Sequence, residues 1–381
     1  MTASLEASAA PQRYSHDQLL AIARRFAGRR PVIDVHPLGN GNINDTFRIS
    51  LDHPAEPYFV LQRINTAVFP NPCQVMQNMC RFTEHVQQRL LEQPMPEGRR
   101  WVVPRVIYTT AGQNHWQEEA GGFWRGISFI ENAKTFDTLQ STAQAWEVGY
   151  GLGMFHQLIS DLPPDTMADT LEGFHITPNY LSAYEQTINN NPITENPEVL
   201  WCTQFIKLRA EHVNVLENAK SSGKLPVRLI HGDPKINNIL FDGDAQQAIS
   251  LIDLDTVKPG LVQYDIGDCL RSGCNPLGEE SSHWENTTFD IDACEGILQG
   301  YYDAAKNFLE AADLDYFYDS VWLITFELGL RFFSDYLSGD VYFKTRYDNH
   351  NLIRALVQFK LLERIEGYRD RIFAIVERLP A

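Results

Sequence analysis

The stretch from Leu229 to Asp255 constrains the fold and the chemistry of this chain more than any other. It reads L-I-H-G-D-P-K-I-N-N-I-L-F-D-G-D-A-Q-Q-A-I-S-L-I-D-L-D, with short apolar runs that end at Gly or Asp. Such runs predict short strands and a hairpin, with polar side chains at their tips. Loops between strands can direct a carboxylate and an amide at one point, so we expect a polar site here. Its candidate members are His231, Asp233, Asn238, Asp253 and Asp255.

This set of side chains suits phosphoryl transfer. The transferred group carries its charge on oxygens, so a protein mainly positions the reacting groups and supplies Mg²⁺. Mg²⁺ usually takes one or two carboxylates together with substrate phosphates, while a separate Asp accepts the proton of the attacking hydroxyl. Protein kinases place an Asn five residues after this Asp, and a metal-binding Asp on a later strand. Asp233 and Asn238 have this spacing and Asp253 follows the hairpin, which predicts a catalytic Asp233 and two metal ligands.

The same stretch resembles the aminoglycoside phosphotransferase and choline kinase superfamily, whose signature is H-x-D-x-x-x-x-N followed by I-D. Within that superfamily, I-D-L-D-T-V-K-P-G at Ile252–Gly260 is similar to bacterial N-acetylhexosamine 1-kinases. Two further stretches agree, G-N-G-N-I-N-D-T at Gly39–Thr46 and R-F-F-S-D-Y-L-S-G-D-V-Y-F at Arg331–Phe343. The resemblance covers nearly the whole chain after about Tyr14.

The resemblance implies an α+β, two-lobed, protein-kinase-like fold. We expect a disordered tail at 1–14, a small antiparallel-sheet N-lobe at 15–131 and a larger, mainly helical C-lobe at 132–381. The implied activity is an ATP- and Mg²⁺-dependent kinase, a phosphotransferase that acts on the anomeric 1-hydroxyl of N-acetylglucosamine or N-acetylgalactosamine. The alternatives are an aminoglycoside, choline or homoserine kinase, or a kinase-fold binding protein without catalysis.

The first third of the chain carries candidate nucleotide contacts. The glycine loop from Gly39 to Asn42 lies between two expected strands, where bare backbone N–H groups can approach phosphates. The third expected strand, Tyr58–Arg63, has Gln62 at the place where kinases have a lysine that contacts the phosphates. Alternation puts Gln62 and Arg63 on opposite faces. Either a bulge turns Arg63 inward, or Gln62 serves as a neutral contact.

The resemblance completes the set of candidate site residues. It places adenine recognition at the backbone of Glu131, and sugar contacts at Arg331 and Tyr342 near the end of the chain. The candidates are as follows: catalytic, Asp233; metal-binding, Asn238 and Asp253; nucleotide-binding, Gly39, Gly41, Asn42, Gln62, Arg63 and Glu131; acceptor-binding, Asn44, Asp233, Arg331 and Tyr342.

Composition limits the partners of the chain. A formal charge of −17 over 381 residues argues against whole-chain affinity for nucleic acid or an anionic membrane. The six Cys form no C-x-x-C pair, and Met1–Pro11 has no basic region followed by an apolar core. These features are typical of a protein of the reducing cytoplasm. We expect a nucleotide and a small sugar as partners, and the sequence carries no signal for an oligomeric state.

Replacing the predicted catalytic carboxylate tests the central assignment. We expect Asp233→Asn to abolish turnover, because the amide cannot accept the proton of the attacking hydroxyl. Nucleotide binding should stay largely intact, since the substitution is nearly isosteric. The check is turnover and nucleotide titration on the same preparation, and full activity of the variant would remove Asp233 from this role.

Overall fold

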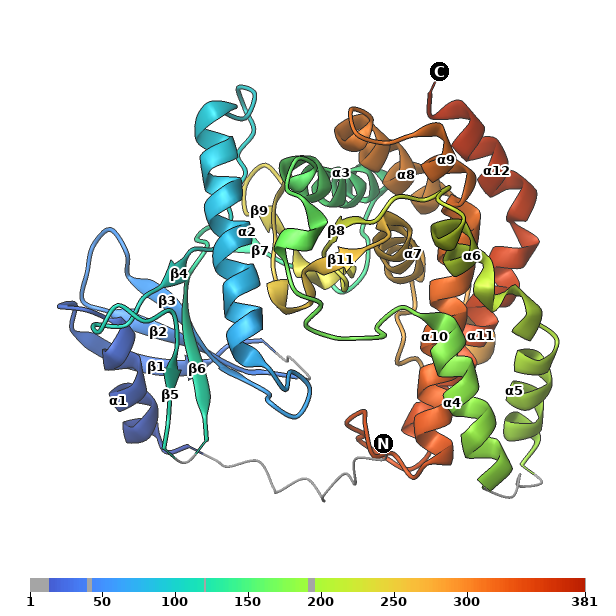
Figure 1. The fold of residues 1–381 in the computed structure, drawn as a ribbon, viewed down its shortest axis with the longest axis horizontal. Coiled ribbons are helices and arrows are strands. Elements are labelled where there is room, and N and C mark those ends of the chain that lie inside the picture. The colour runs from blue at the N-terminus through green and yellow to red at the C-terminus, as the bar shows by residue number, and fades with distance from the viewer. Residues whose placement is uncertain (1–13, 40–42, 120, 191–195, 381) are drawn as a thin grey trace. The chain divides into compact units, whose positions relative to one another are not determined.

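The computed structural model of the protein describes residues 14–39, 43–119, 121–190 and 196–380 (Figure 1). The expected disordered tail at 1–14 lies outside the described residues except for Tyr14. Gly41 and Asn42 of the predicted glycine loop also lie outside them.

The chain divides into two compact units. The first consists of Met1–Pro72 and Pro104–Phe129, and the second of Cys73–Val103 and Ile130–Ala381. We expected the first lobe to run without interruption from 15 to 131. In the structure, residues 73–103 group with the second unit, although the sequence places them between strands of the first.

The first unit is an antiparallel sheet with one helix. Its strand order is β1-β2-β3-β6-β4, and β5 also pairs with β6. The elements are α1 (His16–Phe26), β1 (Val32–Pro37), β2 (Asp45–Leu51), β3 (Tyr58–Ile64), β4 (Val106–Ile107), β5 (Trp116–Gln117) and β6 (Phe123–Ser128). The predicted N-cap Ser15 accepts a hydrogen bond from the backbone of Gln18, which forms a capping box. Leu19 and Phe26 of α1 share a buried apolar cluster with Phe59 and Leu61 of β3.

The second unit is mainly helical and contains two small sheets. One sheet pairs β8 (Arg228–Ile230) with β11 (Lys258–Gly260), and the other has the order β10-β9-β7. The remaining strands are β7 (Ala133–Lys134), β9 (Ile239–Asp242) and β10 (Ala248–Leu251). The helices are α2 (Pro72–Glu92), which begins at the last residue of the first unit, α3 (Thr142–Ile159), α4 (Thr177–Asn190), α5 (Pro197–Lys207), α6 (Val215–Ser221), α7 (Val262–Gly273), α8 (Ile291–Ala305), α9 (Ala311–Asp315), α10 (Phe317–Leu337), α11 (His350–Gly367) and α12 (Arg369–Arg378).

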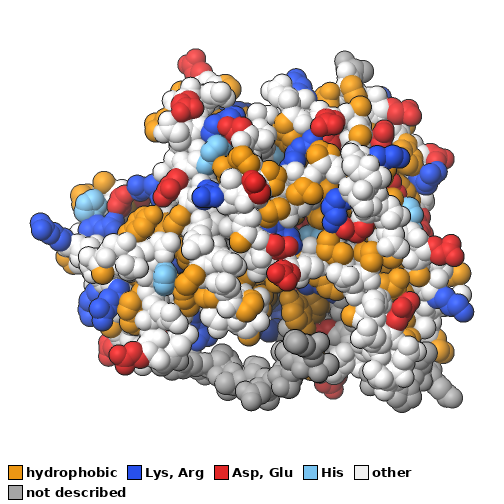
Figure 2. All heavy atoms as spheres, viewed as in Figure 1, with side chains coloured by type: hydrophobic (Ala, Val, Ile, Leu, Met, Phe, Trp, Pro, Cys, Tyr) orange, Lys and Arg blue, Asp and Glu red, His pale blue; other side chains and the backbone are white. Residues whose placement is uncertain are grey.

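This architecture confirms the predicted class of an antiparallel-sheet region followed by a helical region. In the described residues, no helix is both long and apolar enough to span a bilayer. On the face shown in Figure 2, the described acidic and basic side chains are interspersed with apolar ones and form no large field of one sign.

Candidate active site

The residue that follows β8 lies beside the residue that follows β10. His231 follows β8 directly, and its ring Nε2–H donates to the carbonyl oxygen of Ile252 at 2.9 Å. The backbone N–H of Ile252 donates in turn to the carbonyl oxygen of Asn238, also at 2.9 Å. Both polar groups of the Ile252 backbone are therefore used, and Asp253 leaves this point with a left-handed φ of 66°. Such a conformation is rare for a residue with a side chain and is often found at functional sites.

A buried carboxylate binds the backbone of the predicted catalytic loop, residues 231–233. Asp265 of α7 accepts the backbone N–H groups of His231 at 2.6 Å and of Gly232 at 2.8 Å. His156 of α3 lies 2.9 Å from the same carboxylate. Burial alone would raise the pKa of Asp265, but these hydrogen bonds and the nearby His156 lower it below its usual value. Asp265 therefore braces the loop, and His156 contributes to this structural contact.

Gly232 is required by the turn itself. Its φ is 87°, and a Cβ atom there would lie 2.8 Å from the carbonyl oxygen of Thr256. The backbone of His231 also accepts a hydrogen bond from the Thr256 hydroxyl at 2.7 Å. Hydrogen bonds therefore hold the two residues before Asp233 to Asp265 on one side and to Thr256 on the other.

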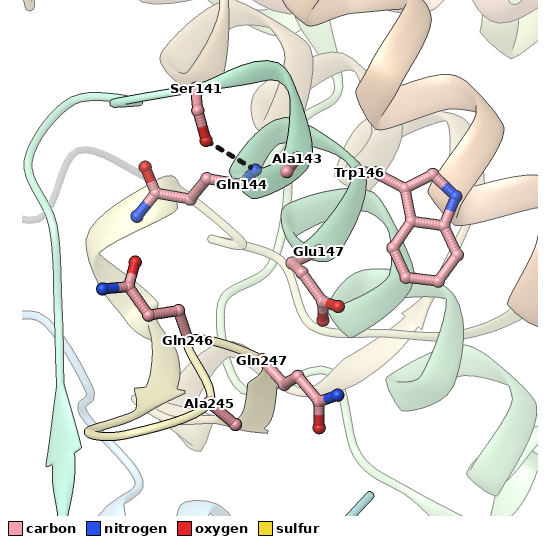
Figure 3. A pocket seen from close by; sticks show the side chains of 8 residues that line it. All are labelled: Ser141, Ala143, Gln144, Trp146, Glu147, Ala245, Gln246 and Gln247. Carbon is pink, nitrogen blue, oxygen red and sulfur yellow. Dashed lines mark hydrogen bonds between the residues drawn. The ribbon is translucent and has the colours of Figure 1, made fainter. Parts of the chain in front are cut away.

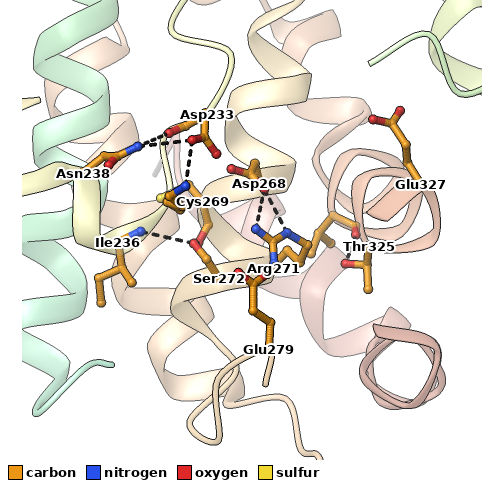
Figure 4. Close-up of polar contacts among 12 residues, drawn as sticks. Asp233, Ile236, Asn238, Asp268, Cys269, Arg271, Ser272, Glu279, Thr325 and Glu327 are labelled. Atoms are coloured by element: carbon orange, nitrogen blue, oxygen red, sulfur yellow. Dashed lines mark hydrogen bonds and ion pairs between the residues drawn. The ribbon is translucent and has the colours of Figure 1, made fainter. Parts of the chain in front are cut away.

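Asp233 is an ionised carboxylate with two close donors (Figure 4). Lys235 Nζ lies 2.9 Å from its Oδ2, and the amide of Asn238 donates to its backbone oxygen at 2.8 Å. Burial would raise the pKa of Asp233, but the Lys235 ammonium lowers it, with contributions from His231 and Arg271. A carboxylate that stays ionised can accept the hydrogen of a substrate hydroxyl.

The sequence analysis missed Lys235, which lies between acidic groups. Asp233 raises the pKa of Lys235, burial opposes this rise, and Asp253 adds to it. Lys235 therefore remains charged beside the predicted catalytic residue. Its place within H-G-D-P-K-I-N-N is the signal that could have identified it.

The predicted metal ligands offer hard oxygen donors. Because the Asn238 nitrogen donates to Asp233, its Oδ1 is the atom left for a metal. The backbone hydrogen bond from Ile252 to Asn238 brings the following residue, Asp253, to the same end of the hairpin. The described residues contain no group of three or more His, Cys, Asp or Glu side chains suited to a metal. One amide and one carboxylate form a smaller set, which fits Mg²⁺ when substrate phosphates supply other ligands.

A second acidic residue of α7 has a different role. Arg271 binds Asp268 at 2.8 Å through Nε and reaches Glu279 at 3.1 Å through Nη1 (Figure 4). Burial raises the pKa of Asp268, and the nearby Asp233 carboxylate adds to this rise. Arg271 therefore pairs with Asp268 within α7.

Aromatic rings surround the guanidinium of Arg331 on α10. Its Cζ lies 5.1 Å from the Phe174 ring centroid, 5.2 Å from Tyr180, 5.9 Å from Tyr342 and 5.4 Å from Phe343. Burial raises the pKa of Tyr180 to about 12, so its hydroxyl stays protonated. Burial lowers the pKa of Arg331, but Tyr180, Glu327 and, more weakly, Asp233 raise it, and the net shift is upward. The guanidinium and the predicted catalytic carboxylate are therefore close enough to interact electrostatically.

Asp335 positions two of these rings. It is buried and accepts the backbone N–H groups of Tyr342 at 2.8 Å and Phe343 at 2.9 Å. Asp335 does not face a ligand together with Arg331. It faces the loop after α10 instead, because the three N–H groups of residues 341–343 converge on it.

His175 connects the catalytic loop with α10. Its Nε2 lies 2.7 Å from the carbonyl oxygen of Gly232 and its Nδ1 lies 3.1 Å from Glu327. Both partners accept, so both ring nitrogens donate and the ring is an imidazolium. Burial lowers the pKa of His175, but Glu327 and the Gly232 carbonyl together raise it by more, so the net shift is upward. The φ of His175 is 67°. No motif in the sequence indicates a role for His175 or Glu327.

The remaining candidates lie in other parts of the chain. In the first unit, Arg63 binds Asp45 at 2.8 Å, and Asn44 accepts the backbone N–H of Asn65 at 2.9 Å. Gly39 has a φ of 71°, which suits a glycine turn. In the second unit, the Glu131 carbonyl oxygen lies 3.4 Å from Arg100.

A separate pocket of about 400 Å³ lies between the start of α3 and the β9–β10 turn (Figure 3). It is lined by Ser141, Ala143, Gln144, Trp146, Glu147, Ala245, Gln246 and Gln247. None of these residues belongs to the predicted site.

Comparison with known proteins identifies the family. The family model described as "Phosphotransferase enzyme family" (APH) matches residues 34–293, more than half of the chain. The chain therefore belongs to the phosphotransferase enzyme family, and its class is that of small-molecule phosphotransferases.

Solved structures share the protein-kinase-like fold. An aminoglycoside phosphotransferase from Alicyclobacillus acidocaldarius has a TM-score of 0.62 and 14% identity, over 98% of both chains. A choline kinase from Cryptosporidium parvum has a TM-score of 0.58 and 14% identity, over 96% of this chain and 99% of its own. A spectinomycin phosphotransferase solved with ADP and spectinomycin has a TM-score of 0.55 and 13% identity, over 96% of this chain and 99% of its own.

The buried pair of His175 and Glu327 predicts a pH dependence of stability. The pKa of His175 is higher in the folded protein than in the unfolded chain. Its contribution to the free energy of unfolding is therefore complete below the unfolded pKa of about 6.5, and it is lost as the pH rises through the folded pKa. Melting temperatures measured between pH 6 and 9.5 should therefore show the largest deficit of Glu327→Gln near pH 6, and a smaller deficit at high pH.

The matched control is Glu363→Gln, which removes a carboxylate from a partly exposed pair with Lys360 on α11. We expect a small effect with little pH dependence there. A deficit of Glu327→Gln that stays constant over the whole pH range would contradict the assignment of a charged His175.

Proposed function

We propose that this phosphotransferase uses ATP and Mg²⁺ to phosphorylate the anomeric 1-hydroxyl of an N-acetylhexosamine, which yields the sugar 1-phosphate. The observation that carries this proposal is the Arg331 guanidinium, enclosed by four aromatic rings near Asp233. This enclosure is the acceptor site in the proposal. The resemblance of Arg331–Phe343 to N-acetylhexosamine 1-kinases agrees with it.

The residues of the catalytic loop take separate roles in this proposal. Asp233 accepts the proton of the sugar 1-hydroxyl and orients its oxygen for attack. Lys235 keeps Asp233 ionised, and its ammonium offsets the negative charge of the transferred group. Asn238 and Asp253 would bind Mg²⁺, which neutralises phosphate charge when it is bound.

The charge of the enclosure favours a neutral acceptor over a cationic one. A choline site needs an aromatic cage that is free for the quaternary ammonium group. Here the four rings already surround the cation Arg331, which would repel choline or the amines of an aminoglycoside. An N-acetylated sugar is neutral, and it offers oxygens to the guanidinium and an apolar ring face to the aromatic side chains.

Homoserine kinase is the second candidate. A guanidinium is a standard partner of a carboxylate, so Arg331 could bind the carboxylate of homoserine. The ammonium group of the same molecule would then lie close to Arg331, and this repulsion places homoserine second.

The nucleotide part of the proposal has separate support. The spectinomycin phosphotransferase of the same fold was solved with ADP. The loop at Gly39–Asn42 is proposed to cover the phosphates, and the backbone of Glu131 to recognise adenine. A non-catalytic binding protein is disfavoured, because Asp233 is kept ionised and well positioned.

The activity test is ADP release with ATP and Mg²⁺ over a panel of acceptors. The panel contains N-acetylglucosamine, N-acetylgalactosamine, glucose, choline, homoserine and kanamycin. We expect turnover on the N-acetylated sugars, and loss of turnover when the 1-hydroxyl is blocked as a methyl glycoside. Turnover on choline or kanamycin alone would overturn the proposed acceptor while leaving the reaction class intact.

Substitution of the enclosed cation tests how the acceptor is selected. Loss of a charged hydrogen bond costs about 1.5–3 kcal/mol, so Arg331→Met should lower kcat/KM for N-acetylglucosamine by at least about 10-fold. The preference for N-acetylglucosamine over glucosamine, whose amine is charged at neutral pH, should also shrink. Arg378→Gln, at an exposed pair with Glu295 on α12, is the control and should change neither value. An unchanged preference in Arg331→Met would contradict charge-based selection.

A further inference from the structure

Strand β3 lacks the lysine that kinases use to bind the nucleotide phosphates, and the structure shows a different cation beside the same position. Gln62 of β3 pairs directly with Arg125 of β6 in the antiparallel register. The Arg125 guanidinium donates to the Gln62 side-chain oxygen through Nε at 2.9 Å and Nη2 at 2.7 Å. The amide nitrogen of Gln62 donates to the Thr46 hydroxyl at 2.9 Å.

Arg63, the other candidate cation, has a different environment. Side chains alternate along β3, so Arg63 lies on the same face as Phe59 and Leu61, which pack in the apolar cluster with α1. There Arg63 binds the Asp45 carboxylate at 2.8 Å and lies 5.3 Å from the Tyr14 ring. Its charge is therefore offset on the helix-covered face of the sheet, opposite to the face that carries Gln62.

We propose that Arg125 is the phosphate-binding cation of this protein, in place of the missing strand lysine, and that Gln62 orients it. This inference rests on the proposed nucleotide-dependent transfer. In this arrangement the positive charge lies on β6, at the residue directly opposite the usual lysine position of β3. Adjacent strands lie about 4.8 Å apart, a displacement that a long side chain can cover.

The contact with Gln62 suits this role. An amide oxygen accepts two N–H groups of the guanidinium and fixes its orientation, but it carries no charge that would cancel the cation. Arg125 is only 1% exposed, so its charge lies in a site of low dielectric where attraction to an anion is strong. A guanidinium can also bind a phosphate through two parallel hydrogen bonds, which an ammonium cannot do.

The test measures nucleotide binding separately from turnover. Wild-type protein and the variants Arg125→Gln, Gln62→Glu and Gln62→Lys/Arg125→Gln are titrated with MgADP and assayed for the KM for ATP. Arg125→Gln should weaken binding about 10- to 100-fold, the range expected for loss of one charged hydrogen-bonding group. Gln62→Glu should weaken it as well, because a carboxylate neutralises Arg125 with almost no change of shape. The double variant, which returns a lysine to β3, should recover most of the loss.

Two arginine substitutions complete the experiment. Arg105→Gln removes an exposed arginine that pairs with Glu56 in the same unit, and it should leave nucleotide affinity within about 2-fold, as expected for a weak surface pair. Arg63→Gln tests the competing cation. Loss of affinity in Arg63→Gln but not in Arg125→Gln or Gln62→Glu would overturn the proposal.

The outcomes also separate this inference from the proposed function. Wild-type protein that binds no MgADP would contradict the nucleotide-dependent function. Wild-type protein that binds MgADP, with equal affinity in a folded Arg125→Gln variant, would contradict only the role of Arg125. If Arg125→Gln does not fold, the result for Gln62→Glu decides, and unchanged affinity in that variant overturns the proposal.

Discussion

The catalytic loop depends on one buried carboxylate. Asp265 accepts the backbone N–H groups of His231 and Gly232, and it lies 2.9 Å from His156 of another helix. Burying a carboxylate is costly unless hydrogen bonds stabilise its charge, and Asp265 has these hydrogen bonds. Because Gly232 can adopt a positive φ, the loop turns sharply at this point and presents Asp233 next to Asn238.

A second buried charge joins this loop to the helix that carries the acceptor candidates. His175 contacts Gly232 on one side and Glu327 on the other. Arg331 follows Glu327 by one turn of α10, so these two side chains lie on the same side of that helix. The positive φ of His175 costs conformational energy. The contacts of both ring nitrogens hold the residue in this conformation.

The proposed catalytic residues stand out in the sequence because their spacing is local. Asp233 and Asn238 lie five residues apart, and the hairpin returns the chain to them at Asp253. Lys235 was missed within the same stretch, where an ordinary surface lysine looks the same in sequence. The sequence around Tyr180 does not indicate that its ring contacts the guanidinium of Arg331, which lies far along the chain.

The amino-acid order alone was enough to assign the reaction class and the division into a sheet region and a helical region, because strand, turn and helix signals act over a few residues. The surroundings of each charge arose only on folding. Gln62 and Arg125 are 63 residues apart, and His175 and Glu327 are 152 residues apart. Pairing of strands and packing of helices bring such residues together, and they depend on the whole chain rather than on any local pattern. For this reason the cation beside the strand and the enclosure of Arg331 became visible only in three dimensions.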